Sequence, residues 1–146
     1  MSRNVEQLGQ VFTPLQVVEF MLALCTNRGR ALEPSAGDGV FFQLLRERHA
    51  DCVGIEIDPR VAPEGAEICD FFDYPLSEQF DTIVGNPPYV RFQDVAVDTR
   101  KRLNSRFFDA RSNLFLFFIE KCVRHLKPGG ELVFIVPREF IKLTAA

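Results

Sequence analysis

The stretch "RALEPSAGDGVFFQLLRERHADCVGIEID", residues 30–58, decides the fold of this chain. It opens with a short apolar segment at residues 30–34 and passes through a glycine turn into a helical pattern over residues 37–50. A second apolar segment, with β-branched residues, follows at residues 52–58. A strand, a turn, a helix and another strand in this order predict a βαβ unit with parallel strands.

A further helix is predicted ahead of this unit. Thr13 is the expected N-cap, Pro14 the first helical residue, and Gln16 completes a capping box. Apolar residues follow at helical spacing and Gly29 is the expected stop.

The alternation continues after the unit. Strands are predicted at residues 66–72, 81–85 and 131–136, and a helix at residues 113–126 before the Lys-Pro-Gly-Gly turn. We therefore expect an α/β, Rossmann-like fold with a parallel sheet in the order 3-2-1-4-5 and helices on both faces.

Length and composition indicate one globular domain. The chain has 146 residues, of which 47% are hydrophobic and 25% charged. It contains no apolar run of membrane-spanning length and no signal-peptide pattern, so a cytoplasmic protein without membrane association is expected. Four scattered cysteines without a CxxC pair, and only two histidines, favour reduced core thiols over a metal site.

The net charge of −3 hides an asymmetry. Residues 91–111 contain six basic and three acidic side chains, a net of +3, so the rest of the chain carries −6. A basic segment here could bind a phosphate backbone, and a solvated loop explains the same charges equally well.

Two unusual loops follow the first and fourth predicted strands. The first is "EPSAGDG", residues 33–39, and the second is "NPPY", residues 86–89, in which two prolines stiffen the chain behind an asparagine. Because these two strands are neighbours in the predicted sheet, both loops should open into one cleft at its carboxyl edge.

The first loop and the next two strand ends indicate an adenosine site. The third glycine of a dinucleotide-binding GxGxxG is replaced by Phe42, which disfavours a nicotinamide cofactor. Glu56 is placed to bind ribose hydroxyls, Asp70 to accept from an adenine amino group, and Phe71 to face the ring. A simple turn, a solvated strand end and a core aromatic pair are the competing interpretations of these residues.

These motifs stand in a recognisable order. They are "GQVFTP" (9–14), "LEPSAGDGVF" (32–41), "IEIDP" (55–59), "DFF" (70–72), "GNPPYVR" (85–91) and "SNLFLFFIEKCVRHLKPGGELVFIVP" (112–137). In this order they resemble the gamma-type adenine-specific DNA methyltransferases of restriction–modification systems. Asn-Pro-Pro-Tyr alone also occurs in enzymes that methylate protein glutamine or RNA bases, and the "GQVFTP" segment favours the DNA group.

The resemblance implies S-adenosylmethionine as cofactor and a set of residues that hold it. Thr13 would meet the methionine carboxylate, Glu56 the ribose, Ile57 and Phe71 the adenine ring, and Asp70 its amino group. Phe118 matches a position that lines the cofactor site, although it is also an ordinary core position of a helix. The full set is Thr13, Glu33, Pro34, Ser35, Ala36, Gly37, Glu56, Ile57, Asp70, Phe71, Asn86 and Phe118.

The resemblance likewise implies a catalytic loop made of Asn86, Pro87, Pro88 and Tyr89. The Asn86 side-chain oxygen and the Pro87 carbonyl would accept the two hydrogens of an adenine amine, so that its lone pair faces the methyl group. Tyr89 would stack on a base flipped out of double-stranded DNA. Arg91, Arg100, Lys101 and Arg102 are the candidate phosphate contacts.

The family's catalytic domain continues beyond the last predicted strand, with two further strands and a separate target recognition domain. Residues 1–146 are therefore expected to be a partial catalytic domain, with a specificity or restriction module elsewhere in the parent chain. Two other functions stay open: an amino-methyltransferase acting on protein glutamine or RNA, and a non-catalytic fragment that binds cofactor.

Overall fold

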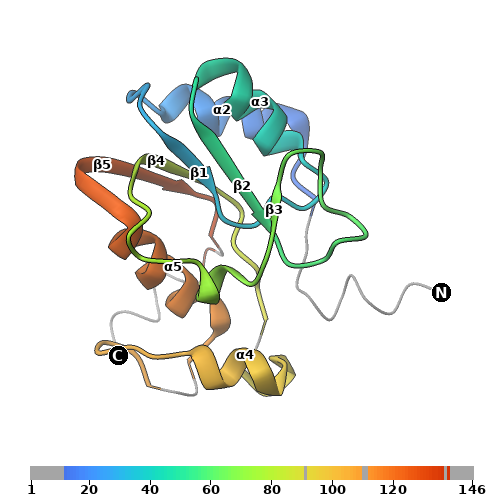
Figure 1. Ribbon diagram of the computed structural model, residues 1–146, viewed down its shortest axis with the longest axis vertical. Helices are drawn as coiled ribbons and strands as arrows, with labels where there is room; N and C mark the ends of the chain where they lie inside the picture. Colours follow the sequence, from blue (N-terminus) through green and yellow to red (C-terminus); the bar gives the residue numbers. More distant parts are fainter. Residues whose placement is uncertain (1–11, 91, 110–111, 137, 139–146) are drawn as a thin grey trace.

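The computed structural model describes residues 12–90, 92–109, 112–136 and 138 (Figure 1). Five parallel strands form one sheet in the order β3-β2-β1-β4-β5, which confirms the predicted topology. The strands are β1 (Ala31–Glu33), β2 (Cys52–Glu56), β3 (Glu67–Ile68), β4 (Phe80–Gly85) and β5 (Leu126–Phe134).

Helices cover both faces of this sheet (Figure 1). Helices α2 (Leu15–Leu24) and α3 (Val40–Arg48) pack on one face through a cluster that includes Val18, Leu22, Leu45 and Val84. Helix α5 (Leu114–His125) packs on the other face around Leu32, Ile55, Phe80, Ile83 and Phe118. Three short elements complete the described chain: η1 (Phe71–Asp73), η2 (Phe92–Asp94) and α4 (Val97–Arg102).

The predicted capping of the first helix was wrong. Pro14 is the N-cap of α2 and no side chain caps the helix; the Thr13 hydroxyl instead accepts a hydrogen bond from Asn86 Nδ2 at 3.2 Å. The helix also ends at Leu24 rather than at Gly29. It stops early because the next amide groups, of Thr26 and Asn27, donate to the Glu131 carboxylate on β5 at 3.0 and 2.8 Å.

Two strand boundaries also differ from the prediction. β5 begins at Leu126, so the Lys-Pro-Gly-Gly sequence lies inside the strand, where the pairing with β4 shifts register between Phe80 and Thr82. Proline is tolerated there because β5 is an edge strand. β3 is only two residues long, since the Asp70 carboxylate accepts from the Phe72 amide at 2.9 Å and turns the chain into η1.

All four cysteines are free thiols, with Cys25 and Cys122 buried and Cys52 and Cys69 half-buried. Within the described residues, no helix is long and apolar enough to cross a membrane. The same part of the chain contains no group of His, Cys, Asp and Glu side chains arranged to hold a metal ion.

Candidate active site

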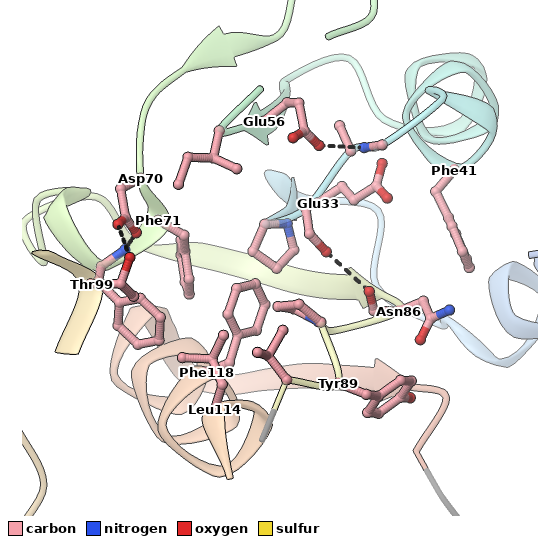
Figure 2. Close-up of a pocket in the computed structure, with 18 of the residues that line it drawn as sticks. Glu33, Phe41, Glu56, Asp70, Phe71, Asn86, Tyr89, Thr99, Leu114 and Phe118 are labelled. Carbon is pink, nitrogen blue, oxygen red and sulfur yellow. Dashed lines mark hydrogen bonds between the residues drawn. The ribbon is translucent and has the colours of Figure 1, made fainter. Parts of the chain in front are cut away.

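A cavity of about 870 Å³ opens at the carboxyl edge of the sheet, where the loops after β1 and β4 meet (Figure 2). All twelve residues predicted to hold a cofactor line it: Thr13, Glu33, Pro34, Ser35, Ala36, Gly37, Glu56, Ile57, Asp70, Phe71, Asn86 and Phe118. Of the catalytic loop, Asn86, Pro88 and Tyr89 line the cavity, whereas Pro87 is fully buried behind it.

Glu56 fixes the shape of the first loop. Its carboxylate, only 3% exposed at the end of β2, accepts from the Gly37 amide at 2.8 Å (Figure 2). It also accepts from the Asp58 amide at 2.9 Å. Gly37 and Gly39 take positive φ angles of 52° and 86°, a conformation that disfavours other residues. The loop after β1 is thereby bound to the end of β2 with an acidic group at the cavity wall.

Glu33 is a buried acid at the base of the cavity. Its side chain is 1% exposed, and its Oε2 atom has no hydrogen-bond partner among the described residues. Burial, together with the charges of Asp38 and Glu56, raises the pKa of this carboxyl well above the ordinary glutamate range. A buried acceptor of this kind can be satisfied by a cationic ligand group.

An apolar slot with one acid forms the opposite end of the cavity. Phe71 and Phe118 are both buried, with ring centroids 4.8 Å apart, and Ile57, which is 46% exposed, also lines the cavity. Asp70 stands at the rim (Figure 2). Phe118 was predicted either to line the cofactor site or to be an ordinary core residue of a helix. It does both, because it belongs to the core under α5 and also lines the cavity.

The acceptor loop is joined to the first loop and to the chain ahead of α2. The Ser35 hydroxyl donates to the Asn86 backbone carbonyl at 3.1 Å (Figure 2). Asn86 Nδ2 in turn donates to the Thr13 hydroxyl at 3.2 Å. The second bond sets the amide orientation, because with Nδ2 turned to Thr13 the Oδ1 atom is left as the acceptor side of the group.

Tyr89 lies beside the acceptor loop with its ring edge-on to Phe115, 5.9 Å between centroids. Its hydroxyl donates to the Ile135 carbonyl at the end of β5. Burial raises the pKa of this phenol to about 12, so the hydroxyl is a donor at neutral pH. The predicted stacking on a target base would use the ring that these two contacts hold.

The basic residues are largely engaged within the protein. Arg100 donates to the carbonyls of Val95 and Gln93 at 2.9 and 2.7 Å, and Lys101 pairs with Asp98 at 3.5 Å. Arg102 pairs with Asp73 at 2.8 Å and with Asp70 at 3.5 Å. Arg91 lies outside the described residues. Phosphate contact by these four residues remains a prediction.

Twelve further residues line the cavity that were not among the predicted site residues. Phe41 and Leu114 belong to the quoted motifs and could have been suspected from them, whereas Asp94 to Thr99 belong to a segment without any motif. The additional lining residues are Phe12, Asp38, Val40, Phe41, Cys69, Phe72, Val90, Asp94, Val95, Ala96, Thr99 and Leu114.

The topology and the cavity define a class I S-adenosylmethionine-dependent methyltransferase fold. A Listeria monocytogenes protein described as belonging to that class superposes with a TM-score of 0.63 at 19% identity, over 87% of this chain and 46% of its own. The methyltransferase subunit of a type I restriction–modification system from Streptococcus thermophilus gives a TM-score of 0.63 at 18% identity, over 88% of this chain and 34% of its own. S-adenosylmethionine is the cofactor of this fold class, in agreement with the prediction.

The chain belongs to the Eco57I restriction-modification methylase family, whose model matches residues 54–146. It is 38% identical over 156 aligned residues to the type II methyltransferase M.TthHB8I of Thermus thermophilus, covering 93% of this chain. It is 35% identical over 145 residues to M.HincII of Haemophilus influenzae, covering 91% of this chain. The chain spans only 36% and 28% of the lengths of these two relatives.

Proposed function

We propose that this chain forms the cofactor-binding and catalytic core of an adenine-specific DNA methyltransferase in a restriction–modification system. The methyl group would pass from S-adenosylmethionine to the exocyclic amine of an adenine flipped out of double-stranded DNA. The observation that carries the proposal is the junction of the two loops, where the Ser35 hydroxyl donates to the Asn86 carbonyl at 3.1 Å. That bond puts the acceptor amide and the glycine-rich loop on one cavity.

The residues around the cavity fit the parts of this cofactor. Its sulfonium supplies an electrophilic methyl group. The unpartnered Oε2 of Glu33 suits the methionine ammonium, and Glu56 can accept from ribose hydroxyls at the end of β2. Phe71, Ile57 and Asp70 offer an apolar slot with one acceptor, which suits an adenine ring and its amino group.

The acceptor loop would orient the amine without a strong base. Thr13 fixes the Asn86 amide so that Oδ1 is the accepting atom, and two prolines stiffen the loop on which the second acceptor, the Pro87 carbonyl, resides. An amine held by two acceptors directs its lone pair away from them, so little reorganisation is needed during transfer. The proton released after transfer can pass to solvent.

Double-stranded DNA would be the macromolecular partner, with sequence recognition supplied by another part of the protein. The type II methyltransferase relatives support this assignment, since each is much longer than the region matched here. Tyr89 offers an aromatic surface for the flipped base, and such a surface offsets part of the unstacking cost.

A labelling experiment tests the proposal. The full protein encoded by this reading frame would receive methyl-labelled S-adenosylmethionine with unmethylated duplex DNA, bulk RNA and cell protein. We expect label on DNA adenine, reduced on the order of a hundredfold by Asn86→Ala. Calorimetry is the matched control: Glu56→Ala should weaken cofactor binding, whereas Asn86→Ala should retain it.

Other outcomes would overturn the proposal in identifiable ways. Label on protein glutamine or RNA would assign the same chemistry to a different acceptor. A folded protein that binds cofactor and labels nothing would be a binding module.

A further inference from the structure

One wall of the cavity comes from a segment that no motif marks. Residues 94–102, here called the α4 segment, contribute Asp94, Val95, Ala96 and Thr99 to the cavity lining, and Thr99 lies beside Asp70 (Figure 2). The segment therefore covers the end of the cavity where the proposed function places adenine. How it is held there decides how firmly that end is closed.

Apolar packing holds only the beginning of this segment. Val95 is 5% exposed and packs with Val90 and Leu114, whereas none of the six residues of α4 is buried. The Arg100 guanidinium donates to the Gln93 and Val95 carbonyls, so it contacts the chain just ahead of α4. The far end of α4 depends on polar contacts.

Arg102 supplies the main one of these contacts. Its Nε atom lies 2.8 Å from Asp73 Oδ1 and its Nη1 atom 3.5 Å from Asp70 Oδ2. One guanidinium thus bridges the N-cap residue of η1 and its last residue. The Thr99 hydroxyl approaches the same Asp70 oxygen at 3.4 Å (Figure 2). Neither Arg102 nor Asp73 lines the cavity, whereas Asp70 does.

We propose that Arg102 is a positioning residue that clamps α4 onto η1 and thereby closes the adenine end of the cofactor cavity. It fixes the Asp70 carboxylate from outside the cavity and keeps Thr99 and Ala96 over the slot. This inference rests on the proposed cofactor site, and it gives Arg102 a role other than the phosphate contact that its basic segment suggests.

The test is a double-mutant cycle on cofactor release, measured without nucleic acid. Arg102→Gln and Asp73→Asn should each raise the dissociation rate of S-adenosylhomocysteine, Arg102→Gln by about two- to fivefold, since the pair is partly exposed. The double variant should be no faster than Arg102→Gln alone, because both changes break one contact. Lys101→Gln is the matched control: it removes the same charge from the neighbouring position, which contacts Asp98 rather than η1.

Hydrogen exchange on the ligand-free protein gives a second readout. Arg102→Gln should lower amide protection in residues 97–102 and 71–73, and Lys101→Gln should not. Three outcomes would each overturn the clamp. The release rates of Arg102→Gln and Lys101→Gln could be equal, the effects of Arg102→Gln and Asp73→Asn on the release rate could multiply in the double variant, or the amide protection could stay unchanged in Arg102→Gln. If the unmodified protein does not bind S-adenosylhomocysteine, the proposed function is overturned instead. Lower amide protection in the ligand-free Arg102→Gln variant would in that case still support the contact between α4 and η1.

Discussion

Glu33 shows how one buried side chain links stability to ligand binding. The folded state raises its pKa through burial and the charges of Asp38 and Glu56, so the folded protein holds this proton more tightly than the unfolded chain. Above the ordinary glutamate pKa of about 4.3, the folded state therefore binds more protons at this group, and stability contributed by it falls as pH rises. An uncharged replacement removes that dependence.

We therefore expect Glu33→Gln to gain stability relative to the unmodified protein as pH rises. Between pH 5 and pH 8 the difference in unfolding free energy should shift towards the variant by more than about 1 kcal/mol, because each unit of pKa shift corresponds to about 1.4 kcal/mol. Urea unfolding of both proteins at several pH values measures it. A difference that is constant with pH would show that Glu33 titrates normally in the folded protein.

Individual positions were predictable where a motif specifies chemistry. Glu56 and Asp70 were placed from their strand ends alone, and both line the cavity. The capping role predicted for Thr13 was wrong, although its local sequence fits a helix cap. Only the folded chain shows that the Thr13 hydroxyl accepts a hydrogen bond from Asn86, which is 73 residues away in the sequence.

Among elements, the packing of α3 on β2 explains the missing third glycine of the first motif. That glycine normally allows a helix to approach the sheet closely, and here Phe42 occupies its position on α3. The room is provided instead by Gly54 of β2: a Cβ atom there would lie 2.7 Å from the Phe42 ring. The small residue that this close packing requires is therefore on the strand and not on the helix.

This exchange predicts a coupled pair of substitutions. Gly54→Ala should destabilise the protein by about 1–3 kcal/mol through overpacking. Combined with Phe42→Leu, it should cost at least about 1 kcal/mol less than the sum of the two single changes, because the smaller side chain makes room for the methyl group. Urea unfolding of the four proteins measures the coupling.

Gly85→Ala is the control, since a Cβ atom at that strand position meets its nearest neighbour at an ordinary 3.5 Å. It should cost clearly less than Gly54→Ala. Strictly additive effects of the Gly54 and Phe42 substitutions would contradict this account of the packing.

Elements with a strong local pattern were predictable, and those set by distant partners were not. The long amphipathic α5 was placed to within a residue at each end, and every strand was found. The early end of α2 depends on Glu131 of β5, and the start of β5 depends on pairing with β4. Helix α4 was not predicted at all, since it has no buried face to produce a periodic pattern.

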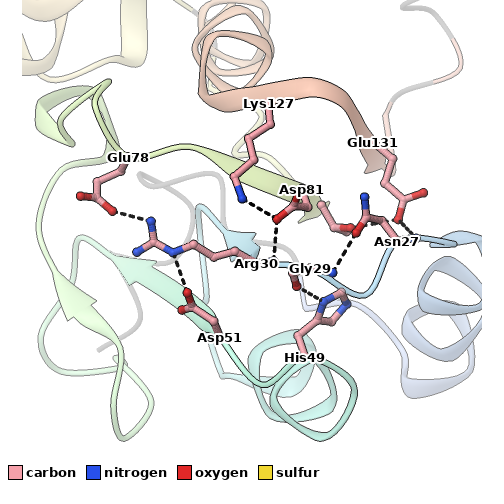
Figure 3. Close-up of polar contacts among 10 residues, drawn as sticks. Asn27, Gly29, Arg30, His49, Asp51, Glu78, Asp81, Lys127 and Glu131 are labelled. Atoms are coloured by element: carbon pink, nitrogen blue, oxygen red, sulfur yellow. Dashed lines mark hydrogen bonds and ion pairs between the residues drawn. The ribbon is translucent and has the colours of Figure 1, made fainter.

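Over the whole molecule, the two edges of the sheet have different roles. The cavity occupies the carboxyl edge, and a network of ion pairs and hydrogen bonds ties together the chain at the opposite edge (Figure 3). Asp81 accepts from the Arg30 amide at 2.8 Å and from Lys127 at 2.7 Å, while the Arg30 side chain pairs with Asp51 and Glu78. None of these five side chains lines the cavity.

Glu131 accepts several of the hydrogen bonds at this edge. Substituting it tests whether the stability of the protein can be lowered without weakening cofactor binding. Its carboxylate accepts from the Thr26 amide and hydroxyl, the Asn27 amide and the Thr82 hydroxyl, all within 3.0 Å. These hydrogen bonds outweigh the effect of burial and lower the pKa of Glu131. Its contribution is therefore complete above the ordinary glutamate pKa and is lost as pH falls through the lowered value.

Glu131→Gln should accordingly destabilise the protein by about 1–2 kcal/mol at neutral pH, because an amide offers only one accepting oxygen to four donors. The difference from the unmodified protein should shrink as pH falls through the lowered pKa of Glu131, where the folded carboxylate becomes protonated. At a temperature where both proteins are folded, their dissociation constants for S-adenosylhomocysteine should agree within about twofold, since no contact of Glu131 reaches the cavity. A folded Glu131→Gln protein with strongly weakened binding would show that the position of α2, and with it Thr13, transmits strain between the two edges of the sheet.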